Sequence, residues 1–294
     1  MIFKKVLKTP AVLTAVMLLF VANIQLSAQN KSGGLALYTI REAMNENPKE
    51  TLQKVAEAGY AYVEDAGYRD GKFYGMEPAE FKAYLNSLGL KPMSTHQRAS
   101  SLEDAEKAIA DVKAAGFQYY VVPSPPWGFF ERNRETGTTK LGGKQKEFVE
   151  FLNALGKKCK EAGLKLLYHN HDFEYKPSEE GVVLIDYLLE NTDPEYVNFQ
   201  MDLYWVTRAK ANPLEYFQKY PGRFKAWHVK DMDSEERFAP VGQGTIDFAS
   251  ILKQQKKSGM EHYFVEQDRT FDDLQPLEAI KISKEGLKKY GFKE

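Results

Sequence analysis

The stretch Leu166–Tyr175 (LLYHNHDFEY) brings together several side chains that bind metals or transfer protons. Its apolar start is followed by two histidines, an asparagine, an aspartate and a glutamate. If the apolar part is a buried strand, the alternation of side chains places His169 and His171 on one face. The polar residues then follow the C-terminal end of that strand, where barrels and open α/β sheets bind their ligands. The stretch therefore predicts a functional site at a strand end.

Three later stretches are organised in the same way, because in each an apolar run ends on a side chain that can bind a metal. They are Val197–Trp205 with Asp202, Phe224–Asp231 with His228 and Lys230, and His262–Asp268 with Glu266. Carboxylate and imidazole ligands without a thiolate suit Mn, Co, Zn, Fe or Mg rather than a structural zinc. We therefore expect these strands to share one divalent metal ion.

The length and net charge of the chain indicate which class of protein it is and which partners it can bind. The chain has 294 residues, of which 43% are hydrophobic and 28% charged, so it can build a substantial globular core. The formal net charge of −1 leaves no basic footprint, and we expect no nucleic acid partner. No linker-like change of composition divides the chain after its first residues. We therefore expect a single catalytic domain over residues 29–294.

The N-terminus has the composition of a signal peptide. Three lysines within the first eight residues precede an apolar run over residues 11–22, and small residues at 26–29 offer a cleavage site. A permanent membrane anchor is the alternative, but the apolar run is shorter than the ~20 residues that a span needs. We expect residues 1–28 to be removed and the protein to be exported to the periplasm, with no membrane contact afterwards.

Short apolar runs and amphipathic stretches alternate along the rest of the chain. Strands that alternate with helices predict an α/β protein with a parallel sheet and right-handed crossovers. A closed (β/α)8 TIM barrel, which needs about 250 residues, fits better than an open doubly wound sheet. The predicted strands are Leu35–Ile40, Tyr60–Glu64, Lys91–His96, Tyr119–Pro123, Leu166–His171, Val197–Asp202, Phe224–Lys230 and Tyr263–Gln267. The predicted helices are Pro48–Ala58, Pro78–Leu88, Leu102–Ala115, Lys144–Ala162, Val182–Glu190, Pro213–Lys219, Phe248–Lys257 and Leu277–Tyr290.

The polar ends of these strands resemble the xylose-isomerase-like sugar (phosphate) isomerase/epimerase superfamily. The segment Tyr168–Tyr175 (YHNHDFEY) is characteristic of one of its branches. The resemblance covers essentially the whole chain after the signal peptide. Each piece alone is weak, but their combination in this order is specific. The other matching segments are Met201–Trp205, His228–Asp231, Val241–Phe248 and Val265–Glu266.

The resemblance implies a set of metal ligands. In the superfamily, Glu, Asp, His and Glu from the fifth to eighth strands hold a divalent metal, and Asp202, His228 and Glu266 match the last three. The first ligand is open, because epimerases carry their glutamate deeper in the strand, where this chain has His169. Either His169 replaces that glutamate or Glu174 reaches back from the loop. We favour Glu174.

The resemblance also implies enolising chemistry on a sugar. A metal bound to a carbonyl and a hydroxyl makes the adjacent C–H more acidic, and a base then removes the proton to give a metal-stabilised enediolate. Carboxylates and imidazoles both serve as bases near neutral pH. Lys230 neutralises the oxyanion, or is instead a solvated lysine of the barrel rim. The expected catalytic residues are His169, His171, Lys230 and Glu266.

Several polar and aromatic residues are expected to bind the substrate. His96 lies at a predicted strand end, and Arg237 resembles a superfamily arginine that contacts substrate, with an ordinary surface role as its alternative. Trp205 stands where epimerases place a histidine three residues after the aspartate, which weakens any claim to their particular sugar contacts. The expected substrate-binding residues are His96, Asn170, Trp127, Trp205 and Arg237.

These expectations lead to a metal-dependent sugar isomerase or epimerase with a small-molecule carbohydrate substrate. Export favours a non-phosphorylated sugar, because free sugar phosphates belong to the cytoplasm, and the sequence shows no Gly-rich phosphate cradle. The first alternative is a lyase that cleaves 3-keto-glycosides by β-elimination, since the same enolising machinery expels a leaving group β to the carbonyl. The second is a non-catalytic periplasmic sugar-binding protein. Assembly into a homo-oligomer stays open.

Overall fold

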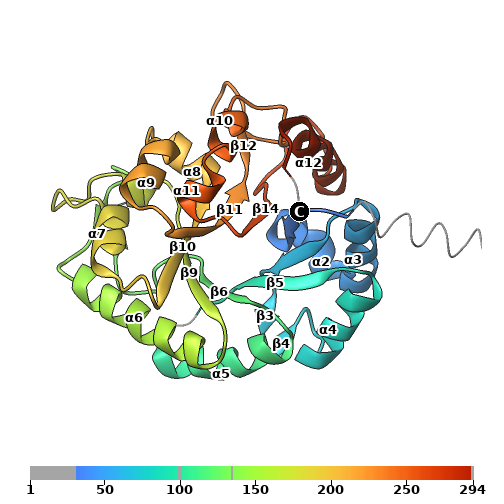
Figure 1. Cartoon of the computed structure of the whole chain (residues 1–294), viewed down its shortest axis with the longest axis horizontal. Helices are drawn as coiled ribbons and strands as arrows, with labels where there is room; N and C mark the ends of the chain where they lie inside the picture. Colours follow the sequence, from blue (N-terminus) through green and yellow to red (C-terminus); the bar gives the residue numbers. More distant parts are fainter. Residues whose placement is uncertain (1–30, 99–100, 134, 293–294) are drawn as a thin grey trace, which may run out of the picture. The chain divides into compact units, whose positions relative to one another are not determined.

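A computed structural model describes residues 31–98, 101–133 and 135–292 (Figure 1). Eight parallel strands close into a barrel in the order β1-β14-β11-β10-β9-β6-β5-β2, which confirms the predicted (β/α)8 fold. The compact unit that contains the barrel begins at Ser32, and the predicted signal peptide over residues 1–28 lies outside the described residues. The barrel strands are β1 (Gly34–Ala36), β2 (Tyr62–Asp65), β5 (Lys91–His96), β6 (Tyr119–Val122), β9 (Lys165–His169), β10 (Val197–Asp202), β11 (Phe224–Val229) and β14 (His262–Val265).

Helices surround the ring of strands (Figure 1). Most of the predicted helices are found with ends shifted by at most two residues, whereas Phe248–Lys257 forms two short helices instead of one. None of the helices in the described part of the chain is long and apolar enough to cross a membrane. The helices are α2 (Arg41–Glu46), α3 (Pro48–Glu57), α4 (Pro78–Ser87), α5 (Leu102–Ala114), α6 (Gln145–Glu161), α7 (Leu184–Asn191), α8 (Leu203–Arg208), α9 (Pro213–Lys219), α10 (Phe248–Leu252), α11 (Gln255–Ser258) and α12 (Pro276–Tyr290), with 3₁₀ turns η1 (Leu37–Ile40) and η2 (Phe173–Tyr175).

Local sequence signals explain where several helices begin and end. Proline stands in the first turn of α3, α4, α9 and α12, where its missing N–H costs no helical hydrogen bond. At the start of α5, Ser101 Oγ accepts a hydrogen bond from Asp104 N at 3.1 Å. Gly259, at φ 87°, ends α11 in the left-handed conformation that favours glycine. These residues set where each of these helices begins or ends.

The interior of the barrel has an apolar layer and a polar layer. Ala36, Tyr62, Leu167, Ala226 and Phe264 pack together inside the barrel. Because side chains alternate along a strand, the next inward positions toward the C-terminal ends follow two residues later. On four strands these positions carry polar groups. They are Glu64, His169, His228 and Glu266. A buried polar cluster therefore lies at the C-terminal ends of the strands, next to the apolar layer inside the barrel.

The loops after the strands carry three small hairpins. The first joins β3 (Tyr68–Arg69) and β4 (Lys72–Phe73) after β2, and the third joins β12 (Asp231–Met232) and β13 (Phe238–Ala239) after β11. The second, β7 (Glu131–Arg132) with β8 (Thr139–Lys140), lies in the long loop after β6. These insertions follow the C-terminal ends of their strands, on the side where TIM barrels bind ligands.

Candidate active site

Four side chains that can bind a metal converge at the C-terminal ends of neighbouring strands. They are His169 of β9, Asp202 of β10, His228 of β11 and Glu266 just beyond β14. One ligand atom from each lies within 4.8 Å of all the others, and all four side chains are buried. Two imidazoles and two carboxylates suit a divalent ion such as Mn, Co, Zn, Fe or Mg. The convergence of Asp202, His228 and Glu266 agrees with the expectation from the sequence.

Glu174 does not join this group, contrary to the choice we favoured from the sequence. Its Oε1 accepts a hydrogen bond from the Tyr168 hydroxyl at 2.7 Å, and its Oε2 accepts one from His171 N at 2.8 Å. Both carboxylate oxygens are thus engaged in holding the turn after β9. Burial raises the pKa of Glu174 to about 7, although these two hydrogen bonds favour the carboxylate. His169, the alternative that the sequence left open, takes the fourth place.

Glu64, at the end of β2, completes the cluster from the opposite side of His228. Its Oε1 lies 2.6 Å from His228 Nε2, while His228 Nδ1 lies 2.9 Å from Glu266 Oε2. Although burial favours the neutral ring, the charges of Glu266 and Glu64 raise the pKa of His228 well above its ordinary value. A carboxylate behind a metal-binding histidine fixes the tautomer and the orientation of the ring. Nδ1 therefore faces Asp202 and Glu266.

Gln200 orients two more histidines of the cluster. Its Oε1 lies 3.0 Å from His169 Nδ1 and 3.0 Å from His96 Nε2, and its Nε2 donates to Glu64 Oε2 at 2.6 Å. Because an amide oxygen only accepts, Nδ1 of His169 carries the proton and Nε2 is left as an electron-pair donor. Burial, reinforced by the neighbouring His228, lowers the pKa of His169 well below its ordinary value. The ring is therefore neutral, as a metal ligand requires.

Lys230 places a buried ammonium among three carboxylates. Its Nζ lies 2.6 Å from Glu266 Oε2, 2.8 Å from Asp268 Oδ1 and 3.0 Å from Asp202 Oδ2. The contact with Asp202 is an ion pair without hydrogen-bond geometry, since Asp202 Oδ2 has no hydrogen bond to any described residue. Burial favours the neutral amine, but the three carboxylates raise the pKa of Lys230 well above its ordinary value. Lys230 is 1% exposed, which excludes a solvated rim lysine.

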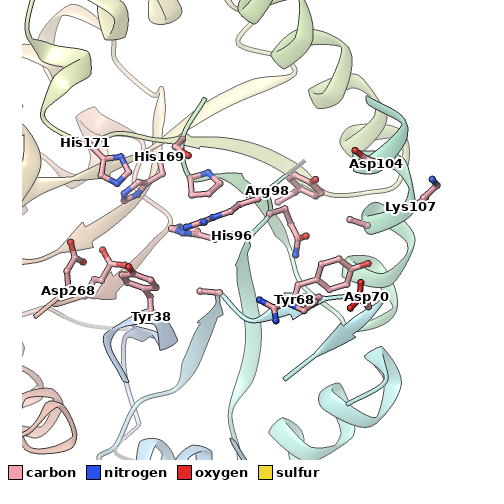
Figure 2. Close-up of a pocket in the computed structure, with 18 of the residues that line it drawn as sticks. Tyr38, Tyr68, Asp70, His96, Arg98, Asp104, Lys107, His169, His171 and Asp268 are labelled. Atoms are coloured by element: carbon pink, nitrogen blue, oxygen red, sulfur yellow. The ribbon is translucent and has the colours of Figure 1, made fainter. Parts of the chain in front are cut away.

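A cavity of about 670 Å³ opens onto this cluster (Figure 2). His171 lines it together with His96, His169, Lys230 and Glu266. The Nδ1 atom of His171 is buried and has no hydrogen-bond partner among the described residues. Burial, assisted by the charge of Lys230, lowers the pKa of His171 to about 4. A neutral imidazole therefore lines the space in which a substrate would lie.

The other predicted substrate-binding residues lie outside the described lining of this cavity. Asn170 is buried, and its Oδ1 accepts a hydrogen bond from Asp202 N at 3.1 Å. Trp205 is half-buried, and the centroid of its ring lies 5.3 Å from Lys230 Nζ. Arg237 pairs with Asp233 at 2.8 Å. Trp127 is fully exposed in the loop after β6. Their substrate contacts stay predictions.

Three polar residues of the site were missed in the sequence, namely Glu64, Gln200 and Asp268. Glu64 ends the predicted strand Tyr60–Glu64, so the rule that singled out the later strands applied here too. Gln200 lies two residues before Asp202 and therefore on the same face of β10. Asp268 follows Glu266 at the same spacing. Alternation along the strands was thus the signal that would have found all three.

Comparisons with known proteins agree with the fold. A family model described as xylose isomerase-like TIM barrel matches residues 52–290. An inosose dehydratase of Salmonella typhimurium is 31% identical over 244 residues, which cover 72% of this chain and 78% of that protein. An inosose dehydratase of Clostridium perfringens is 28% identical over 226 residues, which cover 70% of this chain and 67% of the relative.

A solved structure is similar over almost the whole barrel. The crystal structure of a sugar phosphate isomerase/epimerase from Parabacteroides distasonis superposes with a TM-score of 0.76 at 27% sequence identity. The match covers 88% of this chain and 98% of that one. The named activities of these three proteins include a dehydratase as well as an isomerase/epimerase, so likeness alone leaves the reaction type open.

Proposed function

Since the chain belongs to the xylose isomerase-like TIM-barrel family, we propose that it is a metal-dependent lyase. In this proposal it removes a proton beside the ketone of a neutral, polyhydroxylated ring and expels a substituent from the next carbon. The two inosose dehydratases support elimination, because a dehydratase is a lyase. The lyase, which was the first alternative from the sequence, is therefore preferred here over an isomerase or epimerase.

The donor set supports a divalent ion. His169, Asp202, His228 and Glu266 bring their ligand atoms within 4.8 Å of one another, and Asp202 Oδ2 makes no hydrogen bond with the described residues. When bound, such an ion acts as a Lewis acid toward the carbonyl oxygen of the substrate. Glu64 and Gln200 keep the two histidines oriented toward that position. The identity of the ion among Mn, Co, Zn, Fe and Mg stays open.

His171 is the proposed base. Its Nδ1 is unpartnered and its side chain lines the cavity beside the donor set. The imidazole takes the proton from the carbon next to the ketone, and the electron pair of that C–H bond forms the enolate. As the enolate collapses, the bond from the next carbon to its substituent breaks and the pair leaves with the departing oxygen. That oxygen needs one proton, which the protonated His171 can return.

Lys230 supplies fixed positive charge at the reacting end of the cavity. It lines the cavity, and its ammonium is held by Glu266 and Asp268 at 2.6 and 2.8 Å. A buried, oriented cation stabilises negative charge that develops on the substrate oxygen far better than a solvated one. The carboxylates beside it disfavour an anionic substituent at this end, which supports a neutral ring.

One observation carries the proposal: the side chains of His171 and Lys230 line the same cavity as His169 and Glu266, which are two members of the four-residue metal donor set. A periplasmic sugar-binding protein would need none of these groups. Isomerisation or epimerisation is the second candidate, and the similarity to the isomerase/epimerase of Parabacteroides distasonis favours it.

Reaction in heavy water distinguishes the proposed lyase from an isomerase or epimerase. Metal-loaded protein is incubated with an inosose, free ketoses and 3-keto-glycosides, and the products are followed by NMR. The proposal predicts loss of water or of an alcohol from at least one ketone, and His171→Ala should abolish it while the metal content is retained. Deuterium incorporation without elimination would establish the isomerase or epimerase. If the protein binds sugar but neither eliminates nor exchanges deuterium with any ketone, both enzyme proposals are overturned in favour of a binding protein.

A further inference from the structure

The ring of His171 has no hydrogen bond that sets its orientation. Its nitrogens make none with any described residue, whereas the rings of His169 and His228 each face a hydrogen-bonding side chain. A base must present one nitrogen to the C–H bond of the substrate, and a misplacement of about 1 Å can cost a factor of about 100 in rate. Packing against neighbouring rings must therefore orient this imidazole.

Trp205 is one of the rings that pack against His171. The two ring centroids lie 5.6 Å apart, with an angle of 48° between the planes. His169 and Phe173 contact the same imidazole, with centroid distances of 5.0 and 6.3 Å. His171 lines the cavity, but Trp205 does not belong to its described lining. Trp205 therefore contacts the proposed base without itself lining the space for the substrate.

The same tryptophan lies beside Lys230. Lys230 Nζ is 5.3 Å from the ring centroid of Trp205 and 5.5 Å from that of Phe238. The rings of Trp205 and Phe238 meet edge to face, with centroids 5.6 Å apart and an angle of 81°. An ammonium within about 6 Å of an aromatic ring is attracted by the ring quadrupole, most strongly where water is excluded. We call Trp205 and Phe238 the aromatic wall.

Both residues of the aromatic wall stand on anchored parts of the chain. Trp205 lies in the first turn of α8, where its N–H donates to Asp202 Oδ1 at 3.0 Å. Phe238 lies on β13, and its ring packs 4.4 Å from that of Tyr204. The β12–β13 hairpin begins at Asp231, whose buried carboxylate accepts hydrogen bonds from four backbone N–H groups. The aromatic wall therefore has a defined position beside the two reacting side chains.

We propose that the aromatic wall is a positioning element of the active site, in which Trp205 orients the His171 ring and both wall residues keep water from the Lys230 ammonium. This deepens the proposed function and rests on it for the reaction itself. An ammonium without water around it stabilises negative charge on the substrate oxygen more strongly, because less of its field is screened. Trp205 then acts through His171 and Lys230, and not through the sugar contact that the sequence predicted for it.

Steady-state kinetics distinguishes a positioning role of Trp205 from a substrate contact. Proton removal beside the ketone is followed in heavy water, as elimination or as deuterium exchange, so the measurement holds for either reaction. Trp205→Leu should lower kcat by about 100-fold and leave KM unchanged, because no substrate contact is lost. Trp205→Phe should restore most of kcat, since it keeps an aromatic ring. A raised KM with kcat retained in Trp205→Leu would overturn the proposal.

Phe238→Leu tests the second residue of the aromatic wall. It should lower kcat by about tenfold, as expected for the loss of one cation–π contact at the reacting end. Phe151→Leu is the matched control, because Phe151 is also half-buried but packs on Phe129 and Phe148. It should leave kcat unchanged. Equal kinetics of Phe238→Leu and Phe151→Leu would exclude Phe238 from the positioning element.

The His171 ring gives a measurement without turnover. NMR of Zn²⁺-loaded protein with isotope-labelled histidine identifies its signals by their loss in His171→Ala. Wild type and Trp205→Phe should each show one sharp set, whereas Trp205→Leu should show broadened or multiple sets with the His262 signals unchanged. One sharp set in Trp205→Leu would contradict the positioning role. Failure of the proposed function would appear separately, as no proton removal from any ketone while the His171 signals respond as expected.

Discussion

His228 lies between two carboxylates, with Nε2 2.6 Å from Glu64 Oε1 and Nδ1 2.9 Å from Glu266 Oε2. Glu64 also accepts hydrogen bonds from Ser94 Oγ and Gln200 Nε2, both at 2.6 Å, so its position is fixed independently of His228. The negative charge of Glu64 favours the tautomer in which Nε2 carries the proton. The opposite nitrogen is then available on the side of Asp202 and Glu266.

Glu64→Gln should therefore weaken metal binding although Glu64 is not a ligand. Loss of its charge removes the preference for the useful tautomer and lowers the basicity of the ring. A fall in metal affinity of about 10- to 100-fold is expected, measured by calorimetry with Zn²⁺ or Mn²⁺. Glu261→Gln is the control, because Glu261 pairs with Tyr119 and Lys165 away from the site. Equal affinity of Glu64→Gln and wild type would contradict this role.

Lys230 and a divalent ion should compete for the same oxygens. The ammonium contacts Asp202 and Glu266 at 3.0 and 2.6 Å, and both are proposed ligands. Lys230→Met should therefore bind Zn²⁺ at least about tenfold more tightly. Without metal it should be less stable by about 3–5 kcal/mol, because its buried carboxylates lose their partner. Thermal unfolding with and without Zn²⁺ measures both effects.

Lys225→Met is the control for this comparison. Lys225 lies on the same strand and pairs with Glu261 at 3.7 Å, away from the donor set. It should leave Zn²⁺ affinity unchanged. Weaker Zn²⁺ binding by Lys230→Met than by wild type would show that Lys230 supports the ion instead of competing with it.

Glu174 should make the stability of the protein depend on pH. Burial raises its pKa from 4.5 to about 7 in the folded state. Between these values the folded protein holds a proton that the unfolded chain releases, so this contribution to stability is full below pH 4.5 and is lost as pH rises through about 7. Relative to Glu174→Gln, the wild type should lose about 3 kcal/mol over this window.

Urea unfolding of both proteins at pH 5 and pH 8 measures the difference. The comparison with Glu174→Gln is needed because other groups titrate in the same window, for example Asp268, whose pKa burial raises to about 6. If the free energy of unfolding changed equally with pH in both proteins, Glu174 would have an ordinary pKa in the folded state.

The fold was predictable because its signals are local. Strands β5 and β10 have the predicted ends, and α9 has the predicted bounds. Apolar runs of strand length, prolines in first helical turns and glycines after helices each act over a few residues. Strand β9 ends at His169, two residues earlier than predicted, because the Glu174 carboxylate binds His171 N in place of a neighbouring strand. His169 and His171 are therefore not successive inward positions of one strand.

The donor set was only partly predictable because it depends on contacts across the barrel. The choice between His169 and Glu174 was decided by the Tyr168 hydroxyl and His171 N, which a sequence pattern does not reveal. Strand β2 ends in the two acids Glu64 and Asp65, and alternation places them on opposite faces, but the contacts that make Glu64 part of the cluster lie across the barrel. The partners of Glu64 come from strands 30 to 164 residues away in the sequence.

Export stays a prediction, since the N-terminal segment lies outside the described residues. We expect the mature protein to begin near Gln29 and to occur in a soluble extracytoplasmic fraction. N-terminal sequencing of protein from its native host checks this. An intact Met1 in that protein would show that the segment is retained.

The most direct measurement is the metal content of two purified variants, determined by mass spectrometry after dialysis. Wild type should retain one divalent ion per chain. His169→Ala should lose it, because it removes one of the four converging ligands, whereas Glu174→Gln should retain it, since Glu174 only positions the turn after β9. Loss of the ion from Glu174→Gln with retention in His169→Ala, or a wild type without any bound ion, would contradict the assignment of the site.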